Sequence, residues 1–86
     1  MKIQGAIIRE QGVEFAIVVV KHQVVQNRTQ ANETIRSFQP FFPGLPIILM
    51  AQDCQGVPTY FGRSDIARFM ADVPLSAVPW KEYSIA

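Results

Sequence analysis

The sequence predicts an α+β fold, a two-layer α/β sandwich in which two helices pack on a four-stranded mixed sheet. Two segments, residues 15–20 and 47–51, are apolar without the alternation that marks a half-exposed strand. Each is joined to a neighbouring strand-like segment by a short turn that contains glycine, and a helix-like pattern follows each hairpin. The expected order of elements is therefore β-β-α-β-β-α.

The first hairpin comprises residues 2–10 and 13–21, both rich in β-branched side chains. They are separated by Gln11-Gly12, where glycine can take the positive φ of a tight turn. The second of these strands is apolar from Phe15 to Val20, so we expect it to be central and covered on both faces. The first carries charged residues and is expected nearer an edge.

The first helix is predicted to begin at Asn27. Gln30 follows three residues later, which resembles a capping box in which the asparagine side chain binds free amides at the helix start. The apolar positions of this helix form a narrow stripe at intervals of four and three residues: Ala31, Ile35 and Phe38. Pro40 is expected to end the helix.

The second unit repeats this plan. A central strand at 47–51 leads through a turn, Asp53-Cys54-Gln55-Gly56, into a strand over 57–62. Pro58 lacks an amide proton, which places this fourth strand at a sheet border. Ser64 is predicted to cap the final helix, with Asp65 in its first turn and Pro74 as its end. The apolar face of that helix consists of Ile66, Phe69, Met70 and Val73.

The helix between strands two and three predicts that they are parallel and joined by a right-handed crossover. Each hairpin partner then lies outside, which gives the spatial order 1-2-3-4. The tail, residues 74–86, is expected to be irregular because prolines stand at 74 and 79, although it could add a short strand. A chain of 86 residues forms one small globular domain, residues 1–86.

Composition argues against several functions. Eight basic and seven acidic residues are interspersed and give a formal charge of +1, so nucleic acid is an improbable partner. The longest apolar run, Phe15 to Val20, is too short to span a bilayer, and no membrane association is expected. One cysteine and one histidine make a poor metal site, and no cofactor is expected. The single cysteine agrees with a reducing, cytoplasmic location.

The stretch PIILMAQDCQGVPTYFGRSDIARFM, residues 46–70, resembles the C-terminal half of thioredoxin-fold proteins in the order of its elements. The alternative function is a thiol-dependent or thioredoxin-like enzyme that uses Cys54, with His22 or Arg63 nearby in space. The segment KHQVVQN, between strand and helix, contains no cysteine, and His22 is the one histidine that could act as a base. We expect Cys54 to be a turn residue and the protein not to be an enzyme.

Two segments are candidate binding sites. FFPGLP, residues 41–46, places Phe41, Phe42 and Leu45 in a turn, where they either pack on the sheet or await a partner. GRSD, residues 62–65, places Arg63 and Ser64 at a helix N-terminus, which suits weak binding of an anion or a nucleic acid. No residue is predicted to be catalytic.

The covering of the sheet decides the expected function. The two central strands are apolar on both faces, and two short helices have to cover them. If both helices lie on one face, the other must be covered by another protein or a second copy. If they divide between the faces, the chain is self-contained. We favour the first arrangement, a protein-interaction module that forms a homodimer through an uncovered sheet face.

Overall fold

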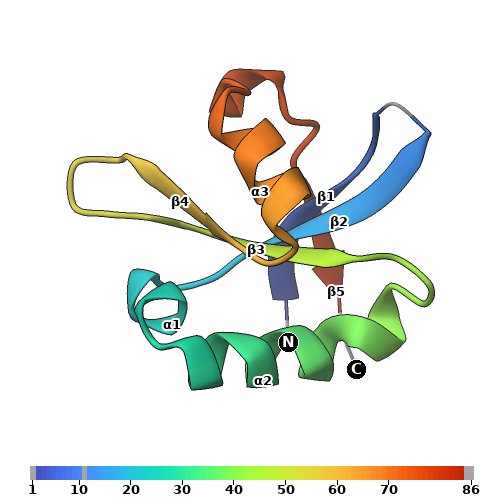
Figure 1. The fold of residues 1–86 in the computed structure, drawn as a ribbon, viewed down its shortest axis with the longest axis horizontal. Coiled ribbons are helices and arrows are strands. Elements are labelled where there is room, and N and C mark those ends of the chain that lie inside the picture. The colour runs from blue at the N-terminus through green and yellow to red at the C-terminus, as the bar shows by residue number, and fades with distance from the viewer. Residues whose placement is uncertain (1, 11, 85–86) are drawn as a thin grey trace.

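The computed structural model describes residues 2–10 and 12–84, and Gln11 of the predicted turn lies outside them. The fold is α+β, with one open mixed sheet of five strands (Figure 1). The elements in chain order are β1 (Lys2–Glu10), β2 (Val13–Val19), α1 (His22–Gln26), α2 (Arg28–Phe38), the 3₁₀ turn η1 (Gln39–Phe41), β3 (Ile47–Gln52), β4 (Pro58–Phe61), α3 (Ser64–Ala71), the 3₁₀ turn η2 (Leu75–Ala77) and β5 (Lys81–Ser84).

The sheet has the order β4-β3-β2-β1-β5. The strands β2 and β3 are parallel, and every other neighbouring pair is antiparallel. The prediction of four strands and an irregular tail is wrong, because the tail returns as β5 and pairs with β1. Gly5, which pairs with Lys81, also lies close to β2: a Cβ atom there would lie 2.4 Å from the Ile17 carbonyl oxygen. Tyr83 then packs against the sheet.

The connection between β2 and β3 contains a helix that the sequence did not predict. This helix, α1, has five residues, and Val24 and Val25 pack from it onto the sheet. The predicted start of the next helix is confirmed, since the Gln30 N–H donates to Asn27 Oδ1 at 3.0 Å. Helix α2 ends at Phe38, just before Pro40, as expected.

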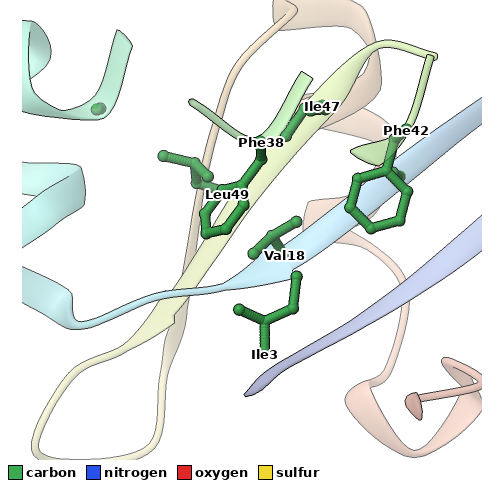
Figure 2. Packing of buried hydrophobic residues seen from close by; sticks show 8 residues of the cluster. Ile3, Val18, Phe38, Phe42, Ile47 and Leu49 are labelled. Atoms are coloured by element: carbon green, nitrogen blue, oxygen red, sulfur yellow. The ribbon is translucent and has the colours of Figure 1, made fainter. Parts of the chain in front are cut away.

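One face of the sheet is covered by α1 and α2, which lie below the sheet in Figure 1. Figure 2 shows Phe38, from α2, and Phe42, which follows η1, close to apolar side chains of the strands. The buried cluster on this face consists of Ile3, Ala16, Val18, Ala31, Phe38, Phe42, Ile47 and Leu49. The residues of this cluster that belong to strands alternate along the chain with residues that point to the opposite face.

The opposite face is covered by α3 and η2 (Figure 1). Its buried cluster consists of Ala6, Phe15, Ile17, Ile48, Met50, Ile66, Met70 and Val78. The expected two-layer sandwich is therefore wrong, because helices lie on both faces of β2 and β3. Ile17 and Val18 point to opposite faces, and both are fully buried. Within residues 2–10 and 12–84, both faces of β2 and β3 are covered, so the uncovered apolar face on which the expected homodimer was based is not found there.

Gly62 sends the chain to this second face. Its φ is +151°, a region that residues with a side chain rarely adopt. A Cβ atom at Gly62 would lie 2.6 Å from Ile48 Cδ1 and 3.0 Å from the Ile47 carbonyl oxygen. The backbone at Gly62 therefore lies close to β3. β4 ends at the preceding residue, and α3 begins two residues after Gly62 on the second face of the sheet.

We predict that Gly62→Ala destabilises the fold more than Gly44→Ala. Both positions have positive φ, but a Cβ atom at Gly44 meets nothing within 4 Å. The Gly44 variant should lose about 1 kcal/mol from backbone strain, and the Gly62 variant about 1–3 kcal/mol more from overpacking. Urea denaturation of both variants measures the difference. Equal losses would show that β4 and α3 do not depend on this close approach.

Candidate functional site: the outer edge of β4

Cys54 lies in the turn between β3 and β4, as expected from the sequence. Its side chain is free and exposed. The turn is closed by the Gly56 N–H, which donates to the Asp53 carbonyl at 3.0 Å, and Gly56 has φ +82°. No hydrogen bond among the described residues joins Cys54 to His22, the base that the alternative function needs. The thiol therefore has none of the polar contacts that activate a nucleophile.

Asp53 organises this turn. Its carboxylate accepts hydrogen bonds from the backbone N–H groups of Gln55, at 2.8 Å, and Val57, at 2.9 Å. The bond from Val57 and then the bond from Gln55 lower the pKa of Asp53, and the charge of the nearby His22 lowers it further by a smaller amount. His22 thus lies at the same end of the sheet as Cys54, but its electrostatic partner is Asp53.

Among the residues predicted to bind a partner, Phe42 and Leu45 contribute to packing. Phe42 is 4% exposed and its ring contacts that of Tyr83 edge-on, with centroids 5.5 Å apart. The Gln39 side chain donates to the carbonyls of Phe42, at 3.2 Å, and Leu45, at 2.8 Å, which holds the turn against the sheet. Phe41 is 46% exposed and points to solvent.

Arg63 and Ser64 stand at the start of α3, but not in the expected roles. The helix begins at Ser64 itself, Arg63 occupies the N-cap position, and no side chain caps the helix, so the predicted Ser64 cap is wrong. Two hydrogen bonds of 2.8 Å join the Arg63 guanidinium to the Asp65 carboxylate. These bonds lower the pKa of Asp65. An anion at this helix start would have to compete with the Asp65 carboxylate.

The sequence placed β4 at a border of the sheet but did not show which of its backbone N–H and C=O groups point outward there. Two hydrogen bonds, one within the β3–β4 hairpin and one between β2 and β3, determine the direction of these groups. The Val57 carbonyl accepts from the Asp53 N–H at 3.0 Å, and the Met50 carbonyl accepts from the Val20 N–H at 2.9 Å. Met50 is thus bonded to β2 rather than to Tyr60, its opposite residue on β4. Because backbone groups alternate in direction along a strand, the N–H and C=O of Tyr60 point outward.

No residue from 57 to 62 carries a charge. Edge strands are commonly protected from pairing by lysines, other charges or prolines. The opposite border strand, β5, follows this rule with Lys81 and Glu82, the latter paired with Lys2 at 3.6 Å. β4 has Pro58 at its first position and only four residues. The two border strands therefore differ in charge, since β5 carries charged residues and β4 carries none.

The side chains of β4 divide between the two faces. Tyr60 lies on the face covered by α3, and its hydroxyl is buried with no hydrogen-bond partner. Burial raises the pKa of this hydroxyl. Phe61 lies on the other face, packed against the cluster beneath α2, and Thr59 is exposed on that same side. The edge thus combines a free main-chain position with aromatic side chains on both faces.

No protein-family model, curated protein or solved structure matches the chain. Within residues 2–10 and 12–84, no three histidine, cysteine or acidic side chains are grouped so that they could hold a metal ion. None of the helices in that part of the chain is long and apolar enough to cross a membrane.

The lowered pKa of Asp53 predicts a pH-dependent stability. Its usual value is 3.8, and a folded-state pKa below it means that the carboxylate stabilises the fold above that pH. This contribution is lost as the pH falls through the folded-state pKa. Asp53→Asn should therefore melt at a lower temperature than the wild type at neutral pH, and the difference should disappear in acid. Glu33→Gln, on the exposed side of α2, is the control. A difference that does not change with pH would contradict this role of Asp53.

Proposed function

We propose that the protein is a protein-association module without catalytic function, and that it binds a β-strand of another polypeptide along the outer edge of β4. The observation that carries this proposal is the uncharged border strand whose Tyr60 N–H and C=O point outward. Main-chain hydrogen bonds in strand addition supply affinity, and the flanking side chains supply specificity.

The covering of both sheet faces supports an edge rather than a face as the binding element. The large hydrophobic side chains that are exposed among the described residues are Ile7, Phe41 and Val57. Val57 is 54% exposed and stands directly before β4, so it extends the edge. Scattered exposed apolar residues are normal on a soluble protein, and a broad face-to-face contact needs a contiguous patch.

A strand added to β4 would gain modest free energy from each contact. A hydrogen bond contributes about 0.5–1.5 kcal/mol net, and a cross-strand side-chain pair about 0.2–1 kcal/mol. Thr59 is exposed and the half-buried Phe61 lies beside it on one face, while the half-buried Tyr60 lies on the other. Because β4 has only four residues, the expected affinity is moderate and the association reversible.

The alternatives receive less support from the geometry. An enzyme based on Cys54 needs a base in contact with the thiol, and the exposed turn shows no such hydrogen bond among the described residues. Binding of an anion or a nucleic acid at Arg63 and Ser64 is opposed by the ion pair of Arg63 with Asp65. The turn that contains Phe41 remains a second candidate contact. We keep a cytoplasmic location as part of the proposal, on the basis of the single cysteine.

We predict that short extended peptides bind β4. The probes are capped peptides in which threonine alternates with valine, isoleucine or tyrosine, titrated into the isotopically labelled protein at a low concentration. The amide resonance of Tyr60 should shift in a saturable way, since its N–H gains an acceptor, while that of Thr34 on α2 should not. Tyr60→Pro should abolish binding because it removes this donor, which faces away from β3. Shifts confined to Phe41 and its neighbours would reject the β4 edge.

A further inference from the structure

We infer that the strand added to β4 is the β4 of a second copy of this chain, paired antiparallel about a two-fold axis that passes beside Tyr60. This inference rests on the proposed function and names the partner. Both copies would contribute the same edge, so the contact is self-complementary and closes as a dimer. The homodimer expected from the sequence is thus proposed again, but through an edge instead of a face.

The hydrogen-bonding groups of β4 fit this register. With the axis at Tyr60, each Tyr60 faces the partner's Tyr60. Since the N–H and C=O of Tyr60 both point outward, the two residues can exchange two hydrogen bonds. Pro58 lies opposite the partner's Gly62, which stands just beyond the end of β4, so the donor that Pro58 lacks is missing at the end of the pairing and not at its centre. The missing N–H of Pro58 therefore leaves the central pair intact.

A shift of the register is less favourable. If the axis passed beside Thr59, Pro58 would face the partner's Tyr60, whose carbonyl would then find no donor. If the axis passed beside Phe61, Tyr60 would face the partner's Gly62. That residue already lies against Ile48 where the chain leaves the sheet, as its close contacts with β3 show. The register centred on Tyr60 is the one in which both outward groups of Tyr60 are satisfied.

The side chains are also compatible in this register. Thr59 lies across from the partner's Phe61 on one face, a β-branched residue beside an aromatic one, and the tyrosines lie across from each other on the other face. No like charges meet along the strand, because residues 57–62 carry none. Arg63 lies beyond the end of β4 and is paired with Asp65 of its own chain, so its charge is balanced where the strand ends.

Sedimentation across a wide dilution series, from low micromolar to near-millimolar protein, tests this inference. We expect a monomer–dimer equilibrium. Thr59→Lys should weaken it at least tenfold, because it places a charge on the pairing edge, and Thr59 is exposed, so the fold should survive. Thr29→Lys, on exposed α2, is the matched control and should change nothing.

The remaining outcomes separate this inference from the proposed function. If the wild type is a monomer at every concentration while the strand peptides still shift Tyr60, the homodimer is wrong and strand binding by β4 stands. If neither association nor peptide binding occurs, both are wrong. If Thr59→Lys does not weaken the dimer but Phe41→Asp dissociates it, the contact lies in the turn after α2. That result would overturn both the β4 homodimer and strand binding by β4.

Discussion

The parallel pairing of β2 with β3 is the constraint on which the rest of this fold depends. The register sets Ala16 to Val19 beside Ile47 to Met50, and these strand residues are apolar on both faces. Such a pair is stable only if both faces are covered, because exposed apolar surface costs about 25 cal/mol per Å². Helix α2, which makes the crossover, covers one face, and α3 covers the other (Figure 1).

Because α2 and α3 both lie on the faces of the central strands, they give the borders of the sheet little protection. β1 is bordered by β5 along residues 2–5, and the charged residues Lys81 and Glu82 protect that side. β4 has no such neighbour, and its protection consists of its short length and Pro58. The Asp53 turn aligns β4 so that Tyr60 directs its backbone polar groups away from β3. The same packing that covers both faces therefore leaves the outer side of β4 without a neighbouring strand among the described residues.

Local patterns predicted much of this fold from the sequence. The uninterrupted apolar runs located β2 and β3, Asn27 located the start of α2, and Pro58 placed β4 at a border, each through the chemistry of neighbouring residues. Ser64 was predicted as a cap by residue type, but the helix starts one residue earlier than that role requires. Helix α1 was missed because its two valines favour strands, and packing against the sheet overrides that preference.

Features that depend on distant residues could not be predicted. Strand β5 depends on its pairing with β1 and on the contact of Tyr83 with the ring of Phe42, which belong to distant parts of the sequence. The face on which α3 lies depends on the passage of Gly62 across Ile48, a contact with no local signature. The candidate site was likewise hidden, because the outward direction of the Tyr60 backbone follows from hydrogen bonds that Asp53 and Met50 make. The signal available in the sequence was the absence of charge from 57 to 62.

Amide hydrogen exchange at β4 tests the central claim most directly. In dilute protein, the N–H groups of Thr59 and Phe61 should exchange slowly, because they point toward β3, while the N–H of Tyr60 should exchange rapidly. In concentrated protein, the N–H of Tyr60 should become protected as the edge pairs, with no change in the N–H of Thr34 on α2. An N–H of Tyr60 that exchanges slowly in the dilute protein, or equally fast at every concentration, would contradict the claim that β4 is an open edge used for association.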